Sequence, residues 1–355
     1  MTDRFTMKAK IGAVDDSPDP FELDGDPNII AVFDADEIAF IVAAACEQRM
    51  VKVVNSSNKA EATLKNRTEF KKLVAGLEIP EDFFSYEDVQ VAEPIQNAIS
   101  TIKKRIAKQA KRVNAGSYEL YIGGVDNFRD FLPLPTKYKS NRKDTVKPLL
   151  LGQIRSYLID YKGATIVNGR EADDALTSRM YDGFKSGQKI VGMTQDKDAT
   201  QSSGWLLNPN KDDPPKYIKG FGELYIDSSG AKDKVRGLGR KFLYLQCLIG
   251  DDIDGYNPRD LVAVVKEKKP TYGEKTAYKQ MLECDNDKKC LQLIADTYKK
   301  WLGTEKFTYE CWEGKSHTIT WVEAFQMYFD CAYMERWEGD KPKVLSMLNK
   351  FKVEI

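Results

Sequence analysis

The sequence predicts an α/β fold with a central, largely parallel sheet flanked by helices. Between about residues 28 and 209, short apolar segments typical of buried strands alternate with longer segments typical of helices. After about residue 255 the pattern becomes mainly helical, and no internal repeat interrupts this order. With 355 residues the chain is long enough for one large domain or two modest ones.

The elements are expected in the following order. A buried strand ends at Asp34 and is followed by an apolar helix, after which a long charged region is expected to be helical at 60–77 and 94–113. The next segments are a strand and turn at 118–129, a helix at 149–161, a strand at 163–169, a helix at 171–187, a strand at 189–198 and a short strand at 205–209.

Three parts follow from this order. Residues 1–27 are polar and rich in Asp and Pro, so a mobile extension is expected there. The core is expected at 28–255, with a basic arch at about 130–148, and a helical C-terminal region at 256–355. No apolar run reaches the roughly 20 residues of a membrane helix, and the N-terminus lacks a signal-peptide pattern, so a cytoplasmic protein is expected.

The composition excludes several kinds of site. The six cysteines contain no CxxC pair, which argues against a zinc ribbon and a disulfide scaffold. The only histidine is His317, which makes a histidine-based triad or metal site improbable. Lys plus Arg and Asp plus Glu balance at 54 each, but residues 101–113 contain six basic residues and no acid. Such segregation suits an enzyme that grips a polyanion in one place and holds metal in another.

Acidic residues follow several of the predicted strands. Asp34, Asp126 and the pair Asp196 and Asp198 come at or just after strand ends, and Glu171, Asp173 and Asp174 open a helix directly after a strand. The carboxyl ends of strands in an open α/β sheet meet at one edge, so these carboxylates should share a cleft. Each like charge raises the pKa of the next carboxyl, so such a cluster needs cations, and hard oxygen ligands suit Mg²⁺ or Mn²⁺.

A further acidic pair, Asp251 and Asp254, is spaced i, i+3 and should lie on one side of a turn, with Asp252 pointing elsewhere. Taken singly, each acidic motif has an ordinary alternative: the acids of EADD also suit helix capping, and TQDKD also suits a solvated turn. The basic counterpart lies at 131–143. Lys139, Arg142 and Lys143 there would contact phosphates, and Tyr138 would offer a face for stacking a base.

These motifs together resemble a known family. In order the chain contains VFD (32–34), VDNFR (125–129), YKSNRK (138–143), READDALT (170–177), TQDKD (194–198) and GDDIDGY (250–256). The set resembles the 5′ nuclease superfamily, which comprises flap endonucleases, the 5′ nuclease domains of bacterial DNA polymerases and, most similar of all, the stand-alone exonucleases of short-tailed phages. The resemblance covers about residues 28–280.

The resemblance implies two divalent ions, Mg²⁺ or Mn²⁺, about 3.5–4 Å apart. The first would be held by Asp34, Asp126, Glu171 and Asp173, with Asp174 reaching it directly or through water, and the second by Asp196, Asp198, Asp251 and Asp254. Lys139 and Arg142 match the family's mobile helical arch, where they would orient the scissile phosphate. Arg129, Tyr138 and Lys143 would assist at the nucleic acid. A host-cell cytoplasm is implied if a phage encodes the chain.

The family also carries a helix-hairpin-helix that binds duplex DNA, often with K⁺. Residues 270–283 resemble its second half, with Gly273, Lys275 and Thr276 at a helix start. Tyr272 replaces the usual first glycine, which leaves the hairpin and its K⁺ site open, with an ordinary helix start as the alternative.

The implied substrate is DNA with a free 5′ end, a flap or a nick, with RNA–DNA hybrid and replication proteins as further partners. Two rival interpretations stay open. FDADE (33–37) with GDDID (250–254) also resembles a haloacid-dehalogenase-like phosphatase, in which Asp34 would be a nucleophile, but READDA, TQDKD and YKSNRK then have no role. A non-catalytic DNA-binding protein on a nuclease scaffold is the other, and the complete set of acids argues against it.

Overall fold

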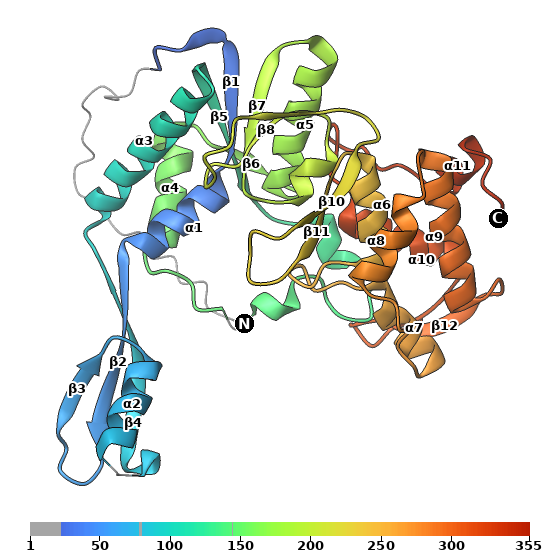
Figure 1. Cartoon of the computed structure of the whole chain (residues 1–355). Helices are drawn as coiled ribbons and strands as arrows, with labels where there is room; N and C mark the ends of the chain where they lie inside the picture. The colour runs from blue at the N-terminus through green and yellow to red at the C-terminus, as the bar shows by residue number, and fades with distance from the viewer. Residues whose placement is uncertain (1–22, 78–79, 144) are drawn as a thin grey trace. The chain divides into compact units, whose positions relative to one another are not determined.

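The structure is a computed structural model that describes residues 23–77, 80–143 and 145–355 (Figure 1). The expected N-terminal extension, apart from residues 23–27, lies outside the described residues. Contacts divide the chain into two compact units. In described residues the smaller unit contains 35–77, 80–108 and 146–163, and the larger unit contains 23–34, 109–143, 145 and 164–355. The described helices include none that is long and apolar enough to cross a membrane.

The larger unit is built on a six-stranded sheet with the order β6-β5-β1-β7-β8-β9. The first five strands in this order pair in parallel, and β9 is added antiparallel at one edge. The strands are β1 (Asp26–Asp34), β5 (Ala115–Gly123), β6 (Thr165–Val167), β7 (Lys189–Met193), β8 (Gly204–Leu207) and β9 (Lys216–Ile218). The predicted α/β class with a largely parallel sheet is confirmed.

Helix α5 (Ala172–Ser186) packs against this sheet, as Figure 1 shows for α5 beside β7 and β8. Leu176 and Met180 of α5 are fully buried against Val32 of β1 and Ile190 of β7. Gly192 on β7 permits the close approach, because a Cβ there would collide with the side chain of Met180. The helix is thereby fixed over the strands whose ends carry the acids.

The chain after β9 forms a helical layer with two small hairpins and a large buried core. Helix α6 (Arg240–Ile249) packs against several of the others, and the aromatic residues Trp321, Phe325, Tyr328 and Phe329 are buried as expected for core packing. The hairpins are β10 (Glu223–Asp227) with β11 (Lys234–Leu238) and β12 (Phe307–Glu310) with β13 (Ser316–Ile319). The remaining helices are α7 (Pro258–Lys266), α8 (Glu274–Leu282), α9 (Asp287–Leu302), α10 (Trp321–Ala332) and α11 (Val344–Lys350).

The smaller unit departs from the sequence prediction. The charged region contains a three-stranded antiparallel sheet with the order β3-β2-β4, in which Val51 and Val53 of β2 pack on Phe70 and Val74 of a helix. The stretch 60–77, expected as one helix, is divided into β3 and α2. The elements are α1 (Ala35–Ala45), β2 (Glu47–Asn55), β3 (Glu61–Leu64), α2 (Arg67–Leu77), the 3-10 turn η1 (Glu81–Phe83), β4 (Phe84–Ala92) and α4 (Leu151–Lys162).

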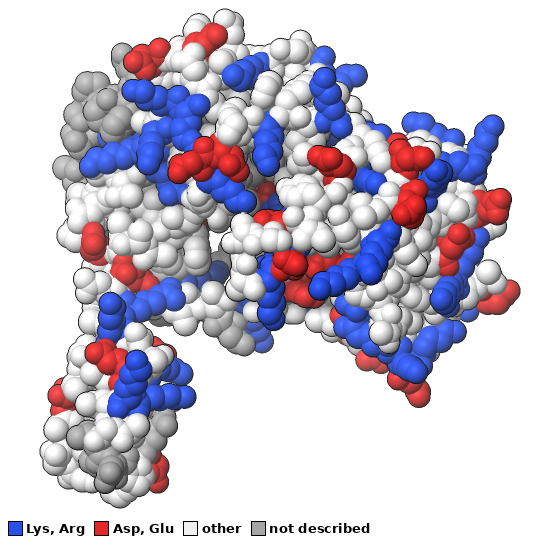
Figure 2. All heavy atoms as spheres, in the orientation of Figure 1, with Lys and Arg blue, Asp and Glu red and all other residues white. Residues whose placement is uncertain are grey.

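The predicted helix at 94–113 is confirmed as α3 (Ile95–Arg112). Its lysines Lys104, Lys108 and Lys111 are exposed and spaced i, i+4 and i+7, which places them on one face of the helix. Lys and Arg side chains accordingly gather over α3 in the space-filling view (Figure 2). The helix offers a cationic face to an anionic partner.

The basic segment at 130–148 was expected to be a helical arch, and its described residues contain no α-helix. It holds the 3-10 turn η3 (Ser140–Arg142) and the end of η2 (Phe128–Phe131). Pro133, Pro135 and Pro148 account for this, because proline removes a helical hydrogen bond and disfavours helix at the residue before it.

Candidate active site

The strand ends carry the acids to one edge of the sheet. Phe33 of β1 pairs with Met193 of β7, so Asp34 at the end of β1 lies beside the start of the segment that contains Asp196. Beside β1, strand β5 ends at Gly123, and β6 leads into Glu171 at the N-cap of α5. Sequence periodicity predicts these positions because each strand is a short apolar run that ends in polar residues.

Asp173 is the centre of negative charge. Its Oδ1 is shielded from solvent and accepts no hydrogen bond from any described residue. Burial, followed by the charges of Asp34, Asp196 and Glu171, raises the pKa of Asp173 well above its ordinary value. A buried carboxylate oxygen without a donor is costly. The arrangement therefore has the electrostatics of a cation site.

A second cluster surrounds Lys197. Its ammonium contacts Asp198 Oδ1 at 2.8 Å and also Asp251. Burial and the charge of Asp196 raise the pKa of Asp198 to about 6, although Lys197 opposes the shift. Burial also acts on Asp251, but Lys197 and two backbone N–H groups outweigh it and lower the pKa of that carboxyl. Lys197 was not predicted as a site residue, although it stands inside the TQDKD motif.

The basic segment 138–143 is tied to the acidic loop 250–256. Lys139 donates its backbone N–H to the carbonyl of Asp254 at 2.8 Å, and Arg142 Nη2 lies 2.7 Å from Asp254 Oδ1. The ammonium of Lys139 contacts Glu171 and lies 3.7 Å from Asp254 Oδ1. Lys139 has a left-handed backbone with φ of 53°. Lys139 and Arg142, the two predicted catalytic residues, thus contact acids that were predicted as metal ligands.

Tyr138 does not lie where base stacking would need it. Its side chain is only 3% exposed, and its ring stacks on that of Tyr256 with centroids 6.2 Å apart. Its hydroxyl donates to Asp254 Oδ2 at 2.8 Å and to Glu171 Oε2 at 3.3 Å. The predicted contact with nucleic acid is therefore replaced by a structural role, because the ring is enclosed by the acidic loop it orients.

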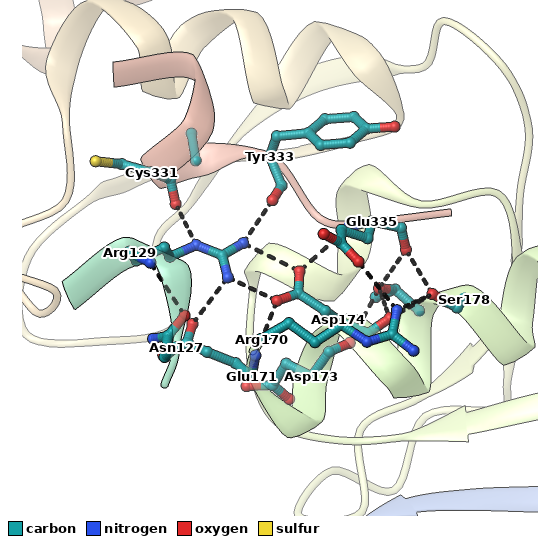
Figure 3. Close-up of polar contacts among 12 residues, drawn as sticks. Asn127, Arg129, Arg170, Glu171, Asp173, Asp174, Ser178, Cys331, Tyr333 and Glu335 are labelled. Carbon is teal, nitrogen blue, oxygen red and sulfur yellow. Dashed lines mark hydrogen bonds and ion pairs between the residues drawn. The ribbon is translucent and has the colours of Figure 1, made fainter. Parts of the chain in front are cut away.

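Arg129 and Asp174 form a buried ion pair, shown in Figure 3. Arg129 is 1% exposed and donates two hydrogen bonds to Asp174, at 2.6 and 3.0 Å. It also donates to the carbonyls of Cys331, at 3.1 Å, and Tyr333, at 2.6 Å. Such burial leaves no surface for the predicted contact between Arg129 and nucleic acid.

Asp174 also departs from its predicted role as a metal ligand. It is fully buried, and its carboxylate accepts the backbone N–H of Glu171 at 3.1 Å and that of Glu335 at 3.2 Å. Burial opposes ionisation, but the charge and hydrogen bonds of Arg129 prevail and lower the pKa of Asp174. Asp174 thus caps the start of α5, which is the alternative considered for EADD, while Asp173 keeps the charge of the site.

Three other acids are placed as follows. Asp126 is exposed in the turn after β5, with φ of 61°, and is not among the charges that dominate at Asp173. Asp252 is exposed, as expected. Asp130 was not predicted, and its pKa is raised by partial burial and by the charge of Glu171. Asp130 is thus closer to the charged cluster than its sequence position after VDNFR suggests.

The predicted nucleic-acid contacts outside the cluster are exposed. Lys143 follows η3 at the surface. Gly273 is the N-cap of α8, and Lys275 and Thr276 are exposed in its first turn. Residues 267–273 join α7 to α8, and Tyr272 packs edge-on against Trp301 with centroids 5.2 Å apart.

The acids fit a hard divalent cation by their chemistry. No group of three or more His, Cys, Asp or Glu side chains in the described residues has the arrangement of a formed metal site. Lysine ammonium groups instead neutralise Glu171, Asp198 and Asp251. The oxygen donors and the unpartnered Oδ1 of Asp173 are nevertheless what Mg²⁺ or Mn²⁺ requires.

Comparison with known proteins gives similar structures only. No protein-family model and no curated protein matches the chain. A mutant of bacteriophage T5 5′-exonuclease is similar with a TM-score of 0.40 and 10% identity, over 91% of this chain and 95% of that chain. The same exonuclease with zinc ions has a TM-score of 0.42 and 13% sequence identity, over 91% of this chain and 96% of that chain. Bacteriophage T5 flap endonuclease, in a pseudo-enzyme-product complex with DNA and metal ions, has a TM-score of 0.44 and 14% sequence identity, over 91% of this chain and 96% of that chain.

Proposed function

We propose that the chain is a metal-dependent 5′ nuclease that hydrolyses DNA phosphodiesters. The observation that carries the proposal is the solvent-shielded, unpartnered Oδ1 of Asp173, whose carboxyl feels the charges of Asp34, Asp196 and Glu171. The six ordered motifs support it, and the cationic face of α3 gives the chain a surface that suits a polyanion.

The chain's residues divide into three tasks. A first divalent cation would be held by Asp34, Asp126, Glu171 and Asp173. A second would be held by Asp196, Asp198, Asp251 and Asp254. Bound divalent cations would lower the pKa of the attacking water and stabilise the leaving oxygen. The buried pair of Arg129 and Asp174 fixes the start of α5, so that Asp173 keeps its place.

Lys139 and Lys197 would neutralise the acids and then contact the scissile phosphate. Both ammonium groups lie among predicted metal ligands, and burial opposes their charge while the neighbouring carboxylates raise their pKa. Each therefore stays protonated at neutral pH. If a metal ion displaced a lysine ammonium group from a carboxylate, the ammonium would remain within reach of a phosphate bound to that metal.

The variant Lys139→Ala is expected to lower turnover on the order of 10²-fold, as loss of a transition-state electrostatic contact does. Steady-state cleavage of a labelled flap substrate checks this, with DNA affinity measured separately in EDTA. Lys143→Ala is the matched control, since Lys143 is an exposed lysine of the same segment. It should change affinity modestly and turnover little. A Lys139→Ala variant that loses only affinity would show that this lysine holds the backbone without aiding chemistry.

The direct test is digestion of 5′- and 3′-labelled duplex, flap and RNA–DNA hybrid substrates with Mg²⁺, Mn²⁺ or EDTA. Release of the 5′ label with either metal, and none in EDTA, is expected. Release from the 3′ end, or cleavage that persists in EDTA, would contradict the proposal. The same assay with K⁺ replaced by Na⁺ tests for a monovalent ion at the helix start around Gly273, and the hybrid arm tests cleavage of the RNA strand.

A further inference from the structure

A cavity of about 570 Å³ lies in the larger unit, among residues that the proposed reaction does not use. Its lining comes from α5, α6, the end of α10, α11, and connecting segments that include residues 201–203 and the stretch between α10 and α11. Six aromatic residues line it: Tyr181, Phe184, Tyr333 and Phe351 are partly exposed, and Tyr244 and Phe329 are buried. The volume falls within the range of sites for small organic ligands, about 300–1,000 Å³.

Two carboxylates behind the wall hold part of it in place. Asp287 accepts the hydroxyl of Tyr244 at 2.7 Å and two hydrogen bonds from Arg240, at 2.7 and 2.8 Å. Asp340 does the same for Arg336, at 2.7 and 3.1 Å, and accepts the hydroxyl of Tyr333 at 2.5 Å. Each group of one acid, one arginine and one tyrosine is locally neutral, and each fixes one ring before any ligand arrives.

The remaining charge of the lining is positive. Lys343 and Lys350 lie at the two ends of α11, are exposed, and form no ion pair with a described residue. No Asp or Glu is among the described residues that line the cavity. Lys350 lies over the ring of Phe351, with Nζ 5.6 Å from the centroid. The rim therefore offers two ammonium groups to an anionic group, and the charge of Asp330, which is not part of the lining, acts on Lys343.

The lining also includes a buried amide with an unused acceptor. Gln201 is 6% exposed, and its Nε2 donates to Gln246 Oε1 and to the carbonyl of Ala332. Its Oε1 has no donor among the described residues. Gln246 in turn donates to Asp198 Oδ1 at 2.6 Å, so one glutamine separates the cavity lining from a proposed metal ligand.

We propose that this cavity binds a nucleoside monophosphate. Aromatic walls suit the faces of a base, and the lysines at the rim suit the phosphate. A purely apolar ligand would leave both ammonium groups without a partner. The site goes beyond the proposed nuclease function, because binding here needs neither divalent metal nor DNA.

The test is isothermal titration of the full chain in EDTA with deoxyadenosine monophosphate, with deoxyadenosine and with inorganic phosphate. The monophosphate is expected to bind at least roughly tenfold more tightly than either fragment, since base stacking and phosphate contacts are both needed. Its affinity should fall as salt rises. Absence of binding by the monophosphate at millimolar concentration would overturn the proposal.

Two variants separate this cavity from the lysines of the active site. Lys343→Ala with Lys350→Ala should weaken binding of the monophosphate roughly tenfold or more, through loss of charge-assisted contacts. Ser346→Trp, an exposed lining position on α11, should block the cavity without changing its charge. Lys288→Ala with Lys300→Ala, two exposed lysines of α9, is the charge-matched control. Binding that survives both cavity variants would refute the assignment, whatever the chain does to DNA.

Discussion

The variant Asp173→Asn should lose Mg²⁺-dependent cleavage, on the order of 10³-fold or more, and its metal-free form should be more stable than the wild type. Its Oδ1 is shielded from solvent and has no donor, and the charges of three acids act on the carboxyl. The amide removes the charge that a cation would need and that the metal-free protein tolerates poorly. The gain in free energy of unfolding is expected to be on the order of 1 kcal/mol.

The gain should depend on pH with a definite sign. A carboxyl whose folded pKa is raised contributes stability below its ordinary pKa of 3.8 and loses it as pH rises through the folded value. The stability difference between Asp173→Asn and the wild type should therefore grow as pH rises from 3.8 through the folded pKa of Asp173 and level off above it. Urea unfolding in EDTA at several pH values measures it, and cleavage of a labelled flap measures activity.

Asp252→Asn is the matched control, because Asp252 belongs to an acidic motif but is exposed. It should leave cleavage and stability unchanged. Full cleavage by Asp173→Asn would reject the metal assignment, whereas lost cleavage together with lost stability in EDTA would indicate a structural role for the carboxylate.

The positions of the acids were accessible from sequence because they depend on local patterns. A strand such as β1 is an apolar run that ends at Asp34, and α5 begins where READDALT follows a short strand. The parallel order of strands then brings their carboxyl ends together without further information. The antiparallel sheet of β2, β3 and β4 was not predicted. Its strands contain only short apolar pairs flanked by charged residues, so they lack a clear strand pattern.

Side-chain partners were harder to foresee because they come from distant parts of the chain. Tyr138 looked like a stacking residue in a basic loop, and only the fold shows that the loop 250–256 encloses it. Arg129 bonds to the carbonyl of Cys331, two hundred and two residues later. Lys197 stands inside TQDKD, but its contact with Asp251, 54 residues later, depends on the fold and not on the local pattern.

Arg129→Met is expected to destabilise the protein by about 3–5 kcal/mol, the usual cost of leaving one partner of a buried ion pair uncompensated. The methionine would leave Asp174 charged in a site that is fully buried, and it would release the carbonyls of Cys331 and Tyr333. Urea unfolding measures the loss. Cleavage should fall too, because Asp174 would no longer hold the start of α5 in place beside Asp173.

Arg179→Met is the matched control, since Arg179, on the helix that carries Asp174, forms a partly exposed ion pair at 2.7 Å with Glu119 of β5. Its loss should cost about 1 kcal/mol or less. Adding Asp174→Leu to Arg129→Met removes the stranded charge, so part of the stability should return. Cleavage should not return with it, because the hydrophobic pair cannot accept the N–H groups of Glu171 and Glu335 that Asp174 now holds. Recovery of both would mean that the C-terminal segment positions α5 by packing alone.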